Sequence, residues 1–499
     1  MKKHLLAIGS AVAVVFTTGQ GWSQAAKSVT EASYARARQV LEAAIQASGG
    51  LEALQGVKNV SRRGRATVFN QGQSPRVDPP YTTRPVEISS FMDFAGGRGS
   101  TETETTGQGG IPTKARTVLV GDSAFGVNLG TNVVTPLLAP AVAGLRAALR
   151  RDPATLLLTA AGRAETLRFL GEEAFEGRPH RVVAFADSDG TQITLYFDAG
   201  TGLLSKYETL ADNPVLGDAL SEVVFSDYRE VGGVKLPSRV VSRTAGETVQ
   251  DAQFSEILAN TRPAASLFES PAQAVRATPT GPPSTVTVAR LGADAYLAEG
   301  SSHNSLFVVF DDHVLLVEAP LGEERSRALM AKIAETAPGK PIKYVVPTHH
   351  HYDHSGGLRA FIASGAIVVT TAGNKVFIER LARTPHTLRP DALFRARRTP
   401  PIEVFAKRRV FTDGTHTVEL HDIGPNPHVN EAVIAYLPKE KLVFQADLVG
   451  LPSYGPLPPA SPATVDFLDK VKRLGLQVET IAGAHGRVGT LEEVSKTLP

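Results

Sequence analysis

The chain has 499 residues, more than one ordinary hydrophobic core accommodates, so two domains are expected. Apolar residues make up 42% and charged residues 20%, which is typical of a folded globular protein rather than a disordered one. The 52 basic and 50 acidic residues leave a net charge of +2 without a basic cluster, which argues against a nucleic-acid partner. The absence of cysteine excludes disulfides, thiol nucleophiles and cysteine zinc ligands.

Residues 1–25 have the pattern of a bacterial secretory signal peptide. Two lysines, Lys2 and Lys3, precede a mostly apolar stretch at residues 5–16, which is too short to span a bilayer as a helix. Small residues before position 26 predict cleavage after Ala25, and an uncleaved N-terminal anchor is the alternative. The mature protein is therefore expected in the periplasm or outside the cell, with no integral membrane segment after cleavage.

A proline-rich stretch at residues 271–284 is predicted to link the two domains. The preceding domain, residues 26–270, is predicted to be rich in β-structure after a helix at residues 30–48. Its strands are predicted at residues 65–69, 86–94, 117–120, 181–185, 192–197 and 223–228. A helical insertion is predicted at residues 136–150 and then 153–161, and packing on the sheet is favoured over a lid.

This N-terminal region resembles the LolA/LolB-like family of periplasmic lipoprotein carriers and sensors. The resemblance is carried by ASGGLEALQGVKNV from residue 47, YFDAGTGLLSKYE from residue 196 and VVFSDYREVGGVKLPSRVV from residue 223. It implies a curved antiparallel β-sheet and a lipid or other hydrophobic ligand. No residue in the region has a catalytic signature.

Residues 285–499 alternate short apolar strands with helices, which predicts a mixed-sheet sandwich. A strand predicted at residues 342–346 is followed by the run HHHYDH at residues 349–354. In an extended turn alternate side chains share a face, so His349 and His351 are expected to converge on one metal. Asp353 and His354 are then offset toward a second metal. The alternative is a surface cluster of histidines.

Three further residues argue against a chance cluster, because each lies where an apolar strand meets a polar or glycine-containing loop. They are His428, Asp447 and His485. Loops at strand ends are where folds of this kind place their functional side chains. The combined set of five histidines and two aspartates is sufficient for two metals.

With these motifs in this order, residues 285–498 resemble the metallo-β-lactamase superfamily. The resemblance implies an αββα sandwich, and hence an α+β protein overall, with metals at one edge of the two sheets. It implies that the first metal is held by His349, His351 and His428. The second would be held by Asp353, His354 and His485, and Asp447 would bridge both.

Two zinc ions are the expected cofactors, although iron or manganese suits the same nitrogen and oxygen ligands. A hydroxide shared by two cations forms near neutral pH and is expected to attack a small ester, thioester, lactone or phosphoester. Asp353 and Asp447 are the predicted catalytic carboxylates. True β-lactamases of this superfamily usually replace the bridging aspartate, so Asp447 argues against dedicated β-lactamase activity. The alternatives are a lipid-binding protein acting through the N-terminal domain and a mononuclear iron oxygenase.

Several neighbouring residues are given lesser roles. His350 is expected to point away from the metals, because its side chain alternates with those of the ligands. Tyr352 is expected to pack. His303 is interpreted as a polar turn residue, and the alternative is that it approaches the site from an early loop. Glu318 is expected to support a ligand from behind. Tyr454, in a loop rich in glycine and proline, is a candidate for contact with the substrate.

Overall fold

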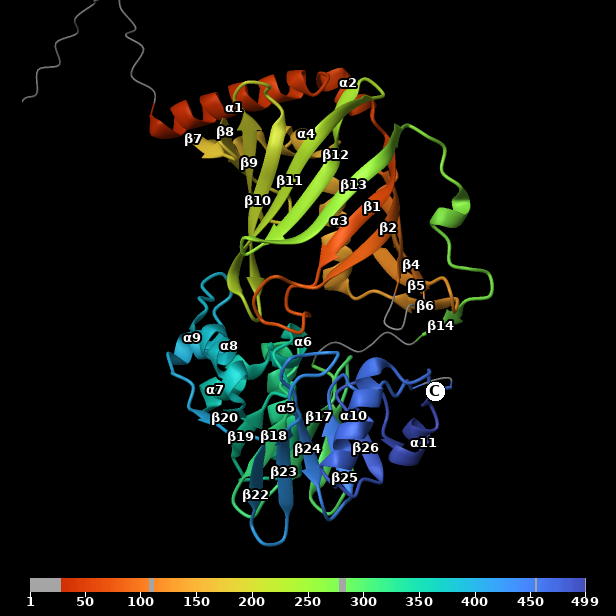
Figure 1. Ribbon diagram of the computed structural model, residues 1–499. Coiled ribbons are helices and arrows are strands. Elements are labelled where there is room, and N and C mark those ends of the chain that lie inside the picture. The colour runs from red at the N-terminus through yellow and green to blue at the C-terminus, as the bar shows by residue number, and fades with distance from the viewer. Residues whose placement is uncertain (1–27, 107–111, 278–283, 454–455, 499) are drawn as a thin grey trace, which may run out of the picture.

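The computed structural model describes residues 28–106, 112–277, 284–453 and 456–498. The predicted signal peptide, part of the predicted linker and Tyr454 lie outside the described residues. Figure 1 shows an N-terminal part, residues 28–277, stacked end to end on a C-terminal part, residues 284–498. Among the described helices, none is both long enough and apolar enough to cross a membrane.

The N-terminal part is built on one sheet of 14 strands. Its first wing runs outward through β1 (Asn59–Phe69), β2 (Thr83–Asp93), β3 (Arg98–Thr106), β4 (Pro112–Val120), β5 (Ser123–Asn128) and β6 (Val133–Pro136). Its second wing comprises β7 (Arg168–Phe175), β8 (Arg178–Ala186), β9 (Gln192–Asp198), β10 (Leu204–Asn213), β11 (Gly217–Val231), β12 (Val234–Thr244) and β13 (Glu247–Ala259). The wings join because β13 pairs antiparallel with β1, and β14 (Val275–Arg276) extends the edge at β6.

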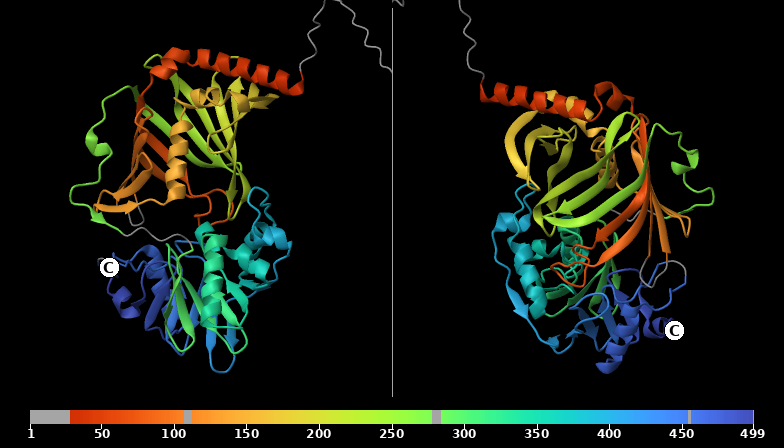
Figure 2. Two further views of the ribbon diagram at one scale, coloured as in Figure 1. Left: turned by 180° about the vertical axis from the view of Figure 1, so that it is seen from behind. Right: turned by 45° about the horizontal axis from the view of Figure 1, so that its top comes forward.

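Helices cover one side of this sheet, which bends around them (Figure 2). They are α1 (Val29–Ala47), α2 (Leu51–Gly56), α3 (Ala139–Arg150) and α4 (Leu156–Ala161), with short 3₁₀ turns at Ala164–Thr166 and Ala265–Leu267. The first helix begins with a capping box between Ser28 and Glu31. Its apolar face packs with α4 and the sheet in one continuous hydrophobic core. The predicted insertion is thus two helices packed on the sheet.

All six predicted strands of this part lie within observed strands, apart from one residue at the end of β2. The eight strands that were not predicted include β3, whose sequence RGSTETETT is almost entirely polar. Such a strand lacks the alternation of apolar and polar side chains that marks a half-buried strand. It forms nevertheless, because β2 and β4 supply hydrogen-bonding partners on both sides.

The C-terminal part contains two sheets. The seven strands of the first, in order, are β15 (Thr287–Arg290), β16 (Ala295–Glu299), β17 (Ser305–Val309), β18 (Val314–Val317), β19 (Ile342–Val346), β20 (Ile367–Thr370) and β21 (Ile402–Val404). The six of the second are β22 (Arg408–Thr412), β23 (Thr417–Asp422), β24 (Val433–Leu437), β25 (Leu442–Gln445), β26 (Thr480–Gly483) and β27 (Gly489–Thr490). Seven helices accompany them: α5 (Glu323–Thr336), α6 (Tyr352–Ser355), α7 (Leu358–Ser364), α8 (Ala372–Arg383), α9 (Ala392–Ala396), α10 (Pro462–Arg473) and α11 (Leu491–Ser495).

Three hydrophobic cores order these elements into four layers. Alternate side chains of both sheets, such as Leu306 and Phe444, form the core between the sheets. The outer face of the first sheet is covered by α5, α7, α8 and α9, and that of the second by α10 and α11. Central strands such as β17 and β24 are buried along their whole length, because both of their faces are covered. The predicted αββα sandwich is therefore confirmed for this part.

Two hairpin connections of the N-terminal sheet contact the C-terminal part. The first is the loop from Asn70 to Thr82 between β1 and β2, which lies over α6 in Figure 1. The second is the turn between β10 and β11. There the Asp218 carboxylate accepts hydrogen bonds from Thr387 N and Oγ1 and from Leu388 N, at 2.6 to 3.0 Å. A Cβ added at Gly217 would lie only 2.2 Å from the Pro385 oxygen, so this contact is close.

Candidate metal centre

The seven predicted ligands come from four segments that follow strands and meet at one end of the sandwich. His349 and His351 follow β19, and the short helix α6 then presents Asp353 and His354. The loop between β23 and β24 carries His428. Asp447 follows β25 and His485 follows β26. These two strands are parallel neighbours, so their C-terminal ends bring the two residues to the same edge.

The ligand atoms gather into two clusters, and within each cluster they all lie within 4.8 Å of one another. The first cluster comprises His349, His351, His428 and Asp447. The second comprises His303, Asp353, His354 and His485. The structure thus brings all seven predicted residues together and adds His303.

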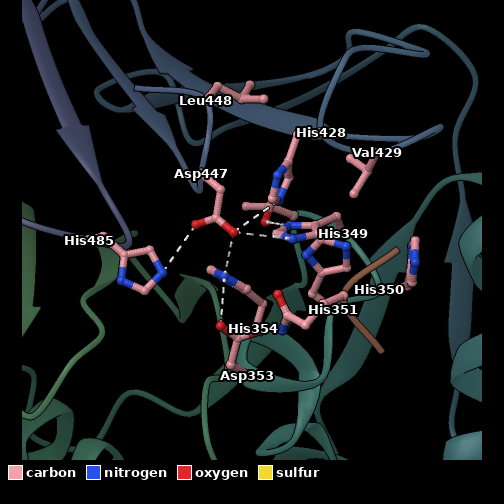
Figure 3. A network of polar contacts seen from close by, with 12 residues as sticks. His349, His350, His351, Asp353, His354, His428, Val429, Asp447, Leu448 and His485 are labelled. Carbon is pink, nitrogen blue, oxygen red and sulfur yellow. Dashed lines mark hydrogen bonds and ion pairs between the residues drawn. The ribbon is translucent and has the colours of Figure 1, made fainter. Parts of the chain in front are cut away.

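Asp447 lies between the two clusters, as Figure 3 shows. Its Oδ2 is 3.0 Å from Nε2 of both His354 and His428, and its Oδ1 is 3.1 Å from Nε2 of His485. None of these three contacts has hydrogen-bond geometry, so they are ion-pair contacts alone. A carboxylate in this place is able to contact cations in both clusters, as a bridging ligand must.

Five buried polar atoms facing this space have no hydrogen-bond partner among the described residues. They are Nε2 of His349, His354 and His428, Nδ1 of His351 and Oδ1 of Asp447. Buried polar atoms without a partner are costly, so such a concentration calls for a bound group that satisfies them. Unprotonated imidazole nitrogens and carboxylate oxygens are ligands for zinc and similar divalent cations. The residues therefore fit a divalent metal site.

The second ring nitrogen of several ligands is held by a neighbouring group. Nε2 of His351 donates to the Ser74 carbonyl at 3.0 Å, and Nδ1 of His485 donates to the Ser302 carbonyl at 2.9 Å. Nδ1 of His354 donates to the Glu318 carboxylate at 2.5 Å. A carbonyl or carboxylate accepts only from a protonated nitrogen, so these contacts leave the opposite nitrogen free for a metal.

Burial and charge set the protonation of the ligands. Burial, reinforced by the neighbouring histidines, lowers the pKa of His351 to about 3 and that of His349 well below its ordinary value. Burial opposes ionisation of Asp447, but its contacts with His354 and the other histidines hold the pKa of its carboxyl far below the usual range. Burial also opposes ionisation of His354 and His485, but the Glu318 and Asp447 carboxylates outweigh it at His354, and Asp447 outweighs it at His485, so the pKa of each ring is raised in the metal-free site. An ionised carboxylate at the centre of the site favours cation binding.

The two clusters differ in their access to solvent. His349, His351 and His354 are fully buried, whereas the side chain of His485 is 39% exposed and that of Asp353 is 32% exposed. The solvent-exposed edge of the site is therefore at Asp353 and His485.

The favoured interpretation of His303 as a polar turn residue is wrong, and the alternative, an approach to the site from an early loop, is confirmed. His303 is buried, its Nε2 lies 3.2 Å from Oδ2 of Asp353, and its ring centroid is 4.2 Å from that of His485. Its neighbours in sequence, Ser302 and Asn304, carry no metal-binding pattern, so only the tertiary arrangement of the β16–β17 loop brings it to the site. Sequence reasoning also missed Gln73 and Ser74, which come from the other part of the chain and have no chemical signature.

The expected orientations of His350 and Tyr352 agree with the structure. His350 belongs to neither cluster, points away from Asp447 in Figure 3 and packs edge-on against Phe377. Tyr352 stacks on the same Phe377, with ring centroids 6.4 Å apart. Both residues therefore support the ligand-bearing turn without reaching the clusters.

Comparison with known proteins yields one family match. Residues 298–485 match the model of the metallo-beta-lactamase superfamily, and this range includes every residue of both clusters. No curated protein matches the chain.

Solved structures similar to this chain include a metallo-beta-lactamase from Pontibacter korlensis, at 22% identity and a TM-score of 0.34, covering 43% of this chain and 97% of that one. Another is the metallo-beta-lactamase FIM-1 from Pseudomonas aeruginosa in its mono-zinc form, at 18% identity and a TM-score of 0.32. The match covers 42% of this chain and 92% of that one. On the strength of the family match, residues 298–485 form a domain of the metallo-beta-lactamase superfamily.

Proposed function

We propose that this chain is an exported, dinuclear metal-dependent hydrolase of a small ester, thioester, lactone or phosphoester. The observation that carries the proposal is the pair of clusters on either side of Asp447, with five buried ligand atoms that have no hydrogen-bond partner among the described residues. A family match over the same residues supports it.

The residues divide into two ligand sets and a shared carboxylate. His349, His351 and His428 would hold one cation, and Asp353, His354 and His485 the other, with Asp447 between them. When bound, such cations lower the pKa of water and polarise a substrate oxygen. The ionised Asp353 borders the solvent-exposed side, where its carboxylate is placed to orient water and to accept a proton.

Zinc is the proposed metal, because thiol ligands are absent and the ligands are nitrogen and oxygen. Iron or manganese suits the same atoms, so the metal content decides between them. The oxygenase alternative needs only one iron. Two clusters of four residues each favour two ions.

Export is proposed from the pattern of residues 1–25. The mature N-terminus, read by mass spectrometry of protein from a bacterial periplasmic extract, tests it. Cleavage after Ala25 is the expected result, and an intact N-terminus in the membrane fraction would contradict it.

Lipid binding through the N-terminal part is the less supported alternative. Side chains of α1, α4 and the sheet fill the core on the helix-covered side. A cavity of about 550 Å³ beside α3 is lined by Asp122, Arg146 and Arg150 together with apolar residues, and such a polar lining does not suit an acyl chain.

The decisive experiment uses the mature chain, residues 26–499. Metals are counted by elemental analysis, and turnover is measured on chromogenic esters, thioesters, lactones and phosphodiesters. His349→Ala is expected to lose metal and turnover, whereas His350→Ala, its matched neighbour, is expected to keep both. A chain that takes up no zinc, iron or manganese would refute the proposal.

A further inference from the structure

Residues 72–75 of the N-terminal part lie directly against the metal centre of the C-terminal part. Oδ1 of Asp353 accepts a hydrogen bond from Nε2 of Gln73 at 2.6 Å. The Ser74 carbonyl accepts from Nε2 of His351 at 3.0 Å. The carbonyls of Gly72 and Pro75 accept from the backbone N–H groups of the ligand-bearing segments, at Tyr352 and Asn430. All four consecutive residues therefore bond to segments that carry ligands.

The Ser74 carbonyl determines which nitrogen of His351 is available. A carbonyl only accepts hydrogen bonds, so Nε2 of His351 must carry the proton. Nδ1 is then unprotonated, and it is the buried atom without a partner that faces His349 and His428. The Ser74 carbonyl thereby fixes the tautomer of His351 that leaves Nδ1 free for a metal.

Gln73 acts in the same way on the second cluster. Its amide holds Oδ1 of Asp353, while Nε2 of His303 lies 3.2 Å from Oδ2. These two contacts on opposite oxygens fix the plane of the carboxylate. Gln73 is itself exposed and borders the open side of the site, so it also faces incoming substrate.

Contacts within the loop from Asn70 to Thr82 hold residues 72–75 against the metal centre. The Ser74 hydroxyl donates to the Asn70 carbonyl and accepts from the N–H of Thr82, both at 2.9 Å, which braces the loop across its base. Gly72 has a φ of 71°, and a Cβ there would lie 2.5 Å from the Tyr352 ring. A residue with a side chain at position 72 therefore meets both backbone strain and a steric clash.

We propose that Gln73 and the Ser74 carbonyl are positioning groups of the metal centre, so that the active site is a composite of both parts of the chain. The N-terminal part then takes part in catalysis by orienting His351 and Asp353 and by forming one wall of the substrate entrance. This inference rests on the proposed function, because it concerns the same site.

The test uses the full mature chain and three variants. Gln73→Leu removes the amide from Asp353 at similar side-chain length, and Gly72→Val displaces the segment that carries the Ser74 carbonyl. Asp218→Ala is the matched control, because it removes three hydrogen bonds between the two parts at the β10–β11 turn, away from the clusters. Each protein is loaded with Zn²⁺, and metal release to a chromogenic chelator is timed. The absorption spectrum of the Co²⁺ form reports ligand geometry.

Loss of a supporting contact typically weakens metal binding by about 10- to 100-fold. Gln73→Leu should speed the release of one of the two metals by roughly this factor and alter the cobalt spectrum, and Gly72→Val should speed the release of both. Asp218→Ala should release metal at the wild-type rate. Thermal unfolding of the metal-free proteins, followed by circular dichroism, verifies that each variant is folded.

Two outcomes would overturn the inference, and they are distinguishable. If the wild type binds two metals while Gln73→Leu and Gly72→Val match it in release rate and cobalt spectrum, the composite site alone is refuted. If the wild type binds no metal, the proposed function fails and this inference fails with it.

Discussion

The buried carboxylate of Glu318 accepts a hydrogen bond from Nδ1 of His354 at 2.5 Å, and its other oxygen accepts one from the backbone N–H of Thr348 at 2.8 Å. Glu318 directly follows β18 and has a left-handed backbone conformation, with a φ of 77°. One carboxylate therefore ties the turn before His349 to the helix that carries His354. Such contacts fix both the orientation and the tautomer of a metal-binding histidine.

Glu318→Gln tests this role. The amide keeps the size of the side chain but offers only one oxygen, so it cannot accept from both His354 and Thr348. We expect zinc affinity about 10- to 100-fold lower than in the wild type, measured by competition with a chelator. Glu419→Gln is the matched control, because Glu419 accepts from His421 at 3.0 Å outside both clusters. Equal zinc affinity in the two variants would contradict the assignment.

Asp447→Asn tests the shared carboxylate. The substitution preserves shape but removes the negative charge that three histidines surround at 3.0 to 3.1 Å. We expect metal content to fall to at most one ion per chain and turnover to be nearly lost, with an unchanged circular dichroism spectrum. Two retained metals with wild-type turnover would show that Asp447 does not bridge the clusters.

His350→Ala should separate packing from metal binding. His350 is buried, donates to the Ser74 carbonyl at 3.0 Å and packs against Phe377, but belongs to neither cluster. We expect the metal-free protein to lose about 1 to 3 kcal/mol of unfolding free energy in urea. Zinc content should remain at the wild-type level, whereas a loss of zinc would make His350 a ligand.

His303→Ala tests the residue that the sequence pattern favoured as a polar turn residue. Burial lowers the pKa of His303, so its ring is neutral; its Nε2 faces Asp353 while Nδ1 lies 2.8 Å from the Ser302 hydroxyl. We expect one of two zinc-binding steps in a calorimetric titration to weaken by about 10-fold or more, with the other unchanged. If both zinc-binding steps are unchanged, His303 is not part of the metal site.

The contrast between His303 and His351 shows how far sequence reasoning reaches. His349, His351, Asp353 and His354 lie within six residues after one strand, so local geometry alone predicts that their side chains converge. Asp447 and His485 are predictable because each lies two residues after an apolar strand, and His428 because it lies in the polar loop that precedes the apolar strand β24.

Neither His303 nor the 72–75 segment has such a signal. His303 is about 50 residues from Asp353 in the sequence, and Gln73 is about 280 residues from it. Both reach Asp353 only because of how their loops are placed in the folded chain. The same limit applies to β3, whose polar sequence forms a strand only because its neighbours pair with it. Contacts that depend on tertiary packing leave no local pattern in the sequence, so the sequence does not predict them.

The buried ion pair between Arg359 and Asp391 ties α7 to the start of α9, and it gives a prediction about stability and pH. Nη2 of Arg359 donates to Oδ1 of Asp391 at 3.0 Å, and Nε donates to Oδ2 at 2.5 Å. Both residues are buried, so Asp391→Asn leaves a buried guanidinium without its charged partner. We expect a loss of about 3 kcal/mol in the unfolding free energy of the metal-free protein at neutral pH.

Burial opposes ionisation of Asp391, but Arg359 outweighs it and lowers the pKa of the carboxyl below its ordinary value of 3.8. A carboxyl with a lowered pKa in the folded state stabilises the fold fully above its ordinary pKa, and this stability is lost as the pH falls toward the lowered value. The difference between wild type and Asp391→Asn should therefore be constant from about pH 8 to pH 5 and shrink below about pH 4. Urea unfolding at a series of pH values measures this difference.

Arg65→Ala, which removes an exposed ion pair with Glu87, is the control. It should lower the unfolding free energy by less than about 1 kcal/mol. A difference that persists undiminished well below pH 4 would mean that the ionised carboxylate of Asp391 is not its source.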